Sequence, residues 1–102
     1  MQIAVVDDNP EEVQAVIAAL EAGGDQCRRF ASGAALIAAL RRDTFDLLLL
    51  DWNMPGMSGL ELLGWLGENL PARPPVIMLT SRTAKEDVIS ALEAGADDFI
   101  IK

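Results

Sequence analysis

Short apolar runs alternate along the chain with longer segments whose apolar residues recur every three to four positions. The four consecutive leucines Leu47–Leu50 show no alternation and are too few for a helix, so they predict a strand buried on both faces. Other short runs predict further strands at Ile3–Val6, Gln26–Phe30, Val76–Leu79 and Phe99–Ile101.

Each segment between two of these strands carries the signals of a helix. Each of these segments begins with a residue that favours the N-cap position of a helix. The four residues are Asn9, Ser32, Ser58 and Thr83. We expect Arg41 and Arg42 in the last turn of the second helix. In the fourth helix we expect Val88, Ile89 and Leu92 to face inward.

Strict alternation of strands and helices predicts an α/β fold with a parallel sheet and right-handed crossovers. The second strand carries Arg28 and Arg29 in its middle, which an edge strand tolerates better than a central one. The flavodoxin-like, doubly wound five-stranded sheet with strand order 2-1-3-4-5 fits both features. The length of 102 residues suits one domain.

The composition excludes several classes of function and site for this chain. The net charge of −8 argues against binding of nucleic acid or an anionic membrane by this segment. The absence of histidine excludes Ser-His-Asp catalysis and His-ligated zinc. A single cysteine, Cys27, and the lack of a secretory signal or long apolar run predict a cytoplasmic location.

In the predicted sheet, polar side chains converge at the carboxyl edge, where Asp7, Asp8, Asp51, Thr80 and Lys102 follow four different strands. Singly, each has an ordinary structural explanation, such as a turn or the first turn of a helix. Jointly, the crowded carboxylates predict a divalent cation, Mg²⁺ or Mn²⁺. A hydroxyl and an ammonium beside them predict a phosphoryl site with Asp51 as nucleophile.

The acidic pair after the first strand, the segment LLLLDWNMPGMSG, the LTS after the fourth strand and the final FIIK together resemble the receiver domain of two-component response regulators. The resemblance implies that Asp51 accepts a phosphoryl group from a partner histidine kinase or phosphotransfer protein. It implies Mg²⁺ held by Asp7, Asp8, Asp51 and the backbone carbonyl of Asn53. It further implies phosphoryl contacts from Thr80 and Lys102, and an aromatic switch at Phe99, for which an ordinary core phenylalanine is the alternative.

By the same resemblance the chain is a regulatory domain, not an enzyme with an external substrate. Phosphorylation is then expected to change the surface of the fourth helix and fifth strand, controlling an output domain or partner, with a homodimer as one candidate outcome. DNA binding would belong to a further C-terminal domain. Receivers continue past this lysine into a fifth helix, so we expect residues 1–102 to be a receiver domain truncated after its fifth strand.

Three other classes of protein are alternatives to a phosphorylated receiver domain. A haloacid dehalogenase phosphatase needs a second aspartate two residues after its nucleophile, where this chain has Asn53. In a flavodoxin, the acidic turn DDNPEE would repel the flavin phosphate. A pseudo-receiver, a docking module that is never phosphorylated, stays the alternative, although the complete set of site residues argues for their use.

Overall fold

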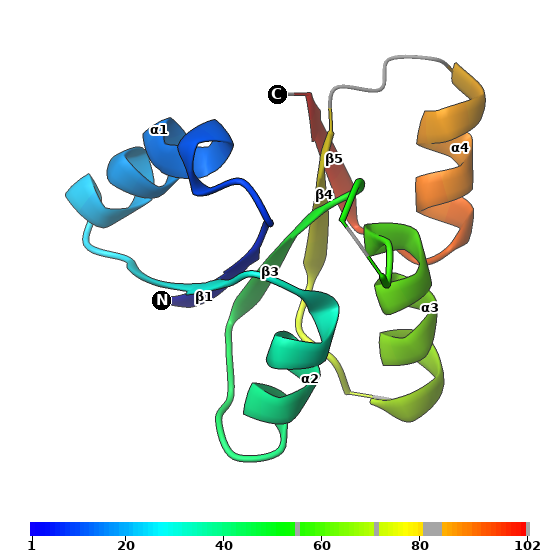
Figure 1. The fold of residues 1–102 in the computed structure, drawn as a ribbon, viewed down its shortest axis with the longest axis horizontal. Coiled ribbons are helices and arrows are strands. Elements are labelled where there is room, and N and C mark those ends of the chain that lie inside the picture. The colour runs from blue at the N-terminus through cyan, green and yellow to red at the C-terminus, as the bar shows by residue number, and fades with distance from the viewer. Residues whose placement is uncertain (55, 71, 81–84, 102) are drawn as a thin grey trace.

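A computed structural model describes residues 1–54, 56–70, 72–80 and 85–101 of the chain. Strands and helices alternate throughout this part (Figure 1). The elements are β1 (Gln2–Val6), α1 (Pro10–Ala22), β2 (Gln26–Phe30), α2 (Gly33–Leu40), β3 (Leu47–Asp51), α3 (Gly59–Asn69), β4 (Val76–Thr80), α4 (Lys85–Glu93) and β5 (Asp98–Ile101).

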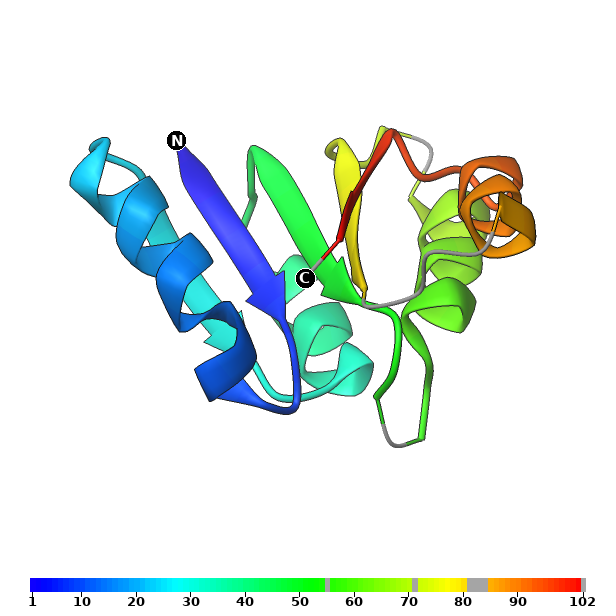
Figure 2. The ribbon, with the colours of Figure 1, turned by 90° about the horizontal axis from the view of Figure 1, so that it is seen from above.

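The strands form one parallel sheet in the order β2-β1-β3-β4-β5, which confirms the predicted fold and places the arginine-bearing β2 at an edge. Helix α1 lies on one face of the sheet, and α2, α3 and α4 lie on the other (Figures 1 and 2). Parallel strands joined by right-handed crossovers give this layering.

Strand β3 is buried on both sides, as its unbroken leucine run predicts. Leu48 and Leu50 belong to the core shared with α2, α3 and α4, whereas Leu49 belongs to the core under α1, and each is at most 2% exposed. Alternate side chains of a strand point to opposite faces, so one short segment contributes to both cores.

The predicted helix starts are confirmed where the structure describes them. The side chain of Asn9 accepts a hydrogen bond from the Glu11 amide, and that of Ser32 accepts one from the Ala35 amide. Ser58 and Glu61 form a reciprocal capping box at the start of α3. Such caps satisfy amides that have no partner within the helix. The predicted cap Thr83 lies outside the described residues.

Two details of the helix prediction are wrong. Ile89 and Leu92 are 43% and 48% exposed, and Ala91 takes the buried position on α4. The sequence of α4 allows two overlapping apolar stripes, one through Ile89 and Leu92 and one through Val88 and Ala91. Only one stripe can face the sheet, and packing selects the one through Val88 and Ala91. Arg41 is the C-cap of α2, and Arg42 follows it, so neither lies in the last turn.

The edge strand β5 is the least covered part of the sheet. Ile100 and Ile101 are 40% and 55% exposed. The predicted fifth helix is not tested by this structure and stays a prediction.

At the amino ends of β4 and β5, Arg73 and Asp97 tie two turns together. Arg73 donates to the carbonyls of Pro74 and Gly95 and to Asp97, whose carboxylate also accepts from the Val76 amide at 2.8 Å. The Val76 amide, and after it the Arg73 guanidinium, lowers the pKa of Asp97. The contacts fix how β5 begins beside β4.

The turn from β3 into α3 brings two backbone segments unusually close together. A Cβ atom placed on Gly59 would lie 2.1 Å from the carbonyl oxygen of Asp51, and the Gly59 amide donates to the carbonyl of Trp52 at 2.9 Å. No side chain fits at that distance, so this position requires glycine.

We therefore expect Gly59→Ala to lower the free energy of unfolding by about 1–3 kcal/mol, because backbone, not a flexible side chain, meets the added methyl. Gly64→Ala is the matched control in the same helix, since nothing lies within 4 Å of its added Cβ. That change should stabilise the protein by about 0.5–1 kcal/mol. Urea unfolding measures both, and equal stability of the two variants would contradict the close approach.

Candidate functional site

The carboxyl ends of the neighbouring strands β1 and β3 bring two aspartates side by side. Val6 of β1 pairs with Leu50 of β3, so the next residues, Asp7 and Asp51, are neighbours with side chains on the same face of the sheet. They are only 6% and 3% exposed. Asp8, one residue further, is exposed to solvent.

These three aspartates form a cluster, as the sequence predicts. One carboxylate oxygen from each of Asp7, Asp8 and Asp51 lies within 4.8 Å of those of the other two. The Asn9 amide donates to Asp7 Oδ1 at 2.8 Å, which holds that carboxylate in the cluster. Like charges this close repel one another, so a cation among them is favourable.

The donor set fits a hard divalent cation. Mg²⁺ takes oxygen ligands at about 2.0–2.1 Å in an octahedron, which places neighbouring ligand oxygens about 3 Å apart. The three carboxylate oxygens lie within 4.8 Å of one another, which is close enough for one ion to reach all of them once the side chains adjust. With carboxylates and no imidazole or thiolate in the cluster, the chemistry suits Mg²⁺ or Mn²⁺ better than Zn²⁺.

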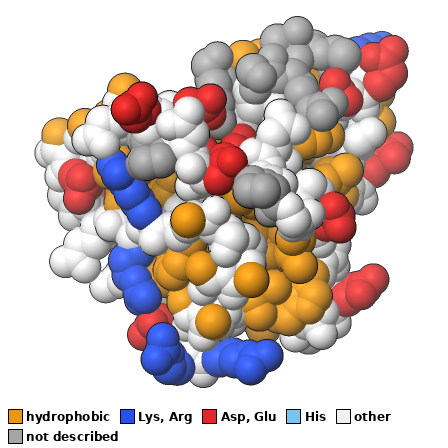
Figure 3. All heavy atoms as spheres, viewed as in Figure 1, with side chains coloured by type: hydrophobic (Ala, Val, Ile, Leu, Met, Phe, Trp, Pro, Cys, Tyr) orange, Lys and Arg blue, Asp and Glu red, His pale blue; other side chains and the backbone are white. Residues whose placement is uncertain are grey.

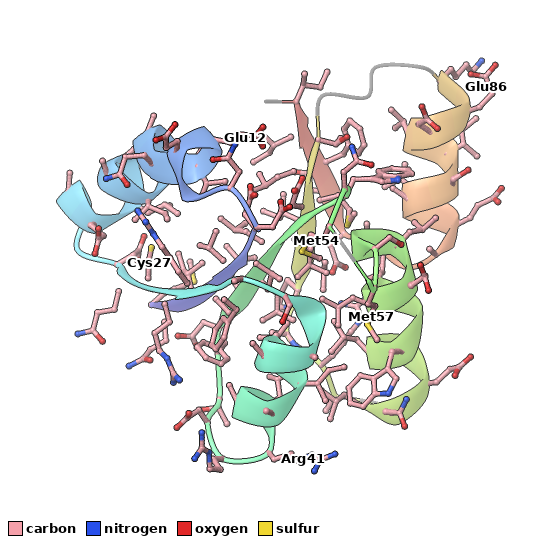
Figure 4. All side chains as sticks on the ribbon, viewed as in Figure 1. Glu12, Cys27, Arg41, Met54, Met57 and Glu86 are labelled. Carbon is pink, nitrogen blue, oxygen red and sulfur yellow. The ribbon has the colours of Figure 1, made fainter. Side chains whose placement is uncertain are left out.

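The loop that follows Asp51 is anchored by buried side chains. Trp52 and Met54 are 7% and 8% exposed, and the Trp52 amide donates to the carbonyl of Leu79 on β4. Met57 lies against α3 (Figure 4), with its sulfur beside Gly33 at the start of α2. Asn53, between the anchors, is exposed. The buried side chains of Trp52 and Met54, on either side of Asn53, thus fix the backbone that follows Asp51.

Thr80 ends β4, directly after Leu79, which pairs with Asp51. It is 1% exposed. Phe99 on β5 pairs with Met78, two residues before Thr80, so Phe99 and Thr80 belong to the same face of the sheet. Phe99 is half-buried against the core shared with α2, α3 and α4.

Lys102 lies outside the described residues, so its predicted place in the site stays a prediction. Strand β5 runs parallel to β4. The last described residue of β5, Ile101, pairs with Thr80.

Two contributions to the site escaped the sequence analysis. Gly59 allows α3 to begin against the backbone of Asp51, and the Asn9 amide orients Asp7. For Gly59, the only signal in the sequence was a glycine directly after the cap residue Ser58. For Asn9, its position as a helix cap gave no sign that its amide also binds Asp7.

No helix within the described ranges is both long and apolar enough to cross a membrane.

Comparisons with known proteins agree with the geometry. A family model described as the response regulator receiver domain matches residues 3–102. The transcriptional regulatory protein KdpE of Mycobacterium tuberculosis (strain CDC 1551 / Oshkosh) is 38% identical over 100 residues, which cover 98% of this chain and 43% of KdpE. The phosphate regulon regulatory protein PhoB of Pseudomonas aeruginosa is 38% identical over 101 residues, covering 98% of this chain and 44% of PhoB.

A solved structure shows the same fold. The receiver domain of a signal transduction histidine kinase from Syntrophus aciditrophicus matches with a TM-score of 0.87 at 36% identity, covering 99% of this chain and 77% of that chain. The present chain spans less than half the length of the curated relatives KdpE and PhoB. By its family match, its relatives and its fold, the chain belongs to the receiver domains of two-component response regulators.

Proposed function

We propose that Asp51 is the phosphoacceptor of this receiver domain. The observation that carries the proposal is the cluster of Asp7, Asp8 and Asp51, in which Asp51 is the most buried member at the end of the central strand. Response regulators take phosphoryl groups from histidine kinases, and the proposed donor is a phosphohistidine on such a kinase or on a phosphotransfer protein.

In the proposed reaction, a carboxylate oxygen of Asp51 attacks the phosphorus of the phosphohistidine. The new O–P bond forms as the P–N bond breaks, and the departing imidazole takes up a proton. The product is an aspartyl phosphate and a neutral histidine on the partner. Thr80 donates a hydrogen bond to a phosphoryl oxygen, and Lys102 neutralises another.

Receiver domains bind Mg²⁺ at an acidic pocket, and the proposed ligands here are Asp7, Asp8, Asp51 and the backbone carbonyl of Asn53. When bound, the ion neutralises negative charge that builds up between carboxylate and phosphoryl oxygens. The burial of Asp7 and Asp51 supports this assignment, because water is partly excluded and charges interact more strongly there.

The full protein's output is proposed from its relatives. KdpE and PhoB are named as transcriptional regulators, and the present chain spans less than half of each. We propose that phosphorylation here controls an output domain or partner, with transcription as the process regulated. Nothing in the described residues favours an unphosphorylated docking module over this function.

The acceptor assignment predicts that Asp51→Asn takes up no phosphoryl group. The amide is nearly the same shape as the carboxylate but is too weak a nucleophile to react. Incubation with a small phosphodonor and Mg²⁺, followed by intact-mass analysis, should show one labile phosphoryl group on the wild type. Asp98→Asn, an exposed aspartate on β5, is the matched control and should label normally. Labelling of Asp51→Asn to the wild-type extent would refute the assignment.

The metal assignment predicts that Asp8→Asn raises the melting temperature in chelator, because one repulsive charge is removed from the cluster. The same variant should lose most of the stabilisation that Mg²⁺ gives the wild type, since a ligand stabilises only the state that it binds. Thermal melts with and without Mg²⁺ measure both effects, and Trp52 fluorescence follows the titration beside Asp51. Equal Mg²⁺ shifts in the two proteins would exclude Asp8 as a ligand.

We also propose that Thr80 and Phe99 form the switch. A hydroxyl drawn toward phosphorylated Asp51 leaves space on the face where Phe99 lies, and the half-buried ring moves inward to fill it. The surface of α4 and β5 changes as a result. A charge-assisted hydrogen bond together with added ring burial is worth a few kcal/mol, roughly what such a shift requires.

The switch predicts that Thr80→Ala still accepts phosphate on Asp51 but no longer transmits it to α4 and β5. Thr80→Ser keeps the hydroxyl and serves as the control, and it should retain most of the response. Phosphorylation-dependent dimerisation or partner binding is the readout, set beside the labelled fraction from intact mass. If phosphorylated Thr80→Ala associates as the phosphorylated wild type does, then the hydroxyl is not the link.

A further inference from the structure

Helix α2 has no charged or polar side chain. Its sequence is GAALIAAL, with Gly33, Leu36 and Ala39 buried against the core. A surface helix usually carries polar residues opposite its buried stripe. Here the solvent side instead carries alanines, and the exposed ones are Ala34, Ala35 and Ala38.

Larger apolar side chains continue this surface toward α3. Ile37 and Leu40 on α2 and Trp65 on α3 are each half-buried. In the space-filling view, apolar side chains gather over α2 and between α2 and α3 (Figure 3). We call the surface made by Ala34, Ala38 and these three side chains the α2–α3 face.

Charges of opposite sign border this face. Arg41 and Arg42, at the end of α2, are exposed, and the Arg41 side chain extends away from the body of the protein (Figure 4). Glu61 and Glu68 are exposed on α3, four residues before and three after Trp65, and so share its side of the helix. Within the described ranges, none of these four residues has an ion-pair partner.

This arrangement is complementary to itself. Helices α2 and α3 both return from the carboxyl to the amino edge of the sheet, so they run in the same general direction. A two-fold axis parallel to them in the plane of contact would set apolar surface against apolar surface. The same axis would bring the arginines of one copy against Glu68 of the other, twice over. Two-fold interfaces require this kind of self-complementarity.

We propose that the α2–α3 face is a contact between two copies of this chain. A second copy pairs the arginines with Glu68 in both directions at once, whereas an acidic segment would leave Glu68 unpaired and a basic segment would leave the arginines unpaired. The net charge of −8 on each copy opposes association, so the dimer is weak, with a dissociation constant in the micromolar range. The contact does not involve α4 or β5, and so it forms without phosphorylation.

Sedimentation velocity without phosphodonor, over a range of protein concentrations, tests the proposal. The wild type should dimerise as concentration rises. Arg41→Glu/Arg42→Glu and Glu68→Lys should each weaken dimerisation by at least about tenfold, because like charges then meet across the interface. An equimolar mixture of the two variants should restore association, since every contact in the mixed dimer joins opposite charges.

Glu93→Lys, an exposed glutamate on α4, is the matched control and should dimerise as the wild type does. Ala38→Lys, in the centre of the face, should also abolish dimerisation. It takes the place of any charge variant whose circular dichroism spectrum shows that it does not fold. A wild type that stays monomeric up to about 1 mM would overturn the proposal. So would a mixture of the variants that stays monomeric, or a dimer that only Glu93→Lys disrupts.

Discussion

Two aspartates with the same charge are buried side by side at the ends of adjacent strands, and the rest of the structure depends on this constraint. Asp7 and Asp51 are almost fully buried and belong to the same face of the sheet. Carboxylates in such a place carry a desolvation cost and repel one another, so the fold must supply enough stability elsewhere to hold them there. The same crowding of buried carboxylates that is unfavourable for the folded chain supports the proposal that a cation and a phosphoryl group bind there.

The stability comes from the strands that carry these residues. Strand β3 buries leucines in both cores, and the β1–β3 register then fixes which side chains meet at the carboxyl edge. A shift of one residue would turn every β3 side chain to the opposite face, so hydrophobic burial and site geometry are set by the same register. The close approach at Gly59 adds a local constraint, because it holds α3 against the backbone of Asp51 itself.

The two faces of the sheet divide the work. Asp7 and Asp51 belong to the face of the sheet that α1 covers, whereas Thr80 and Phe99 belong to the face that α2, α3 and α4 cover. In the proposed switch, phosphorylation occurs on the first side and the movement of Phe99 on the second, and Thr80, at the end of β4, connects the two. On that second side, α2 and α3 present an apolar surface that lies apart from α4 and β5.

The sequence by itself determined the order of elements, the sheet topology, the helix caps at Asn9, Ser32 and Ser58, and the gathering of the three aspartates. These follow from local patterns and from the rule that parallel strands end at one edge. Only the tertiary structure decided that Ala91, not Ile89 or Leu92, faces the sheet, since the sequence of α4 allows two overlapping stripes. It alone also showed why Gly59 must be glycine, because the atom that excludes a side chain belongs to a residue eight positions earlier, across a turn that no local pattern describes.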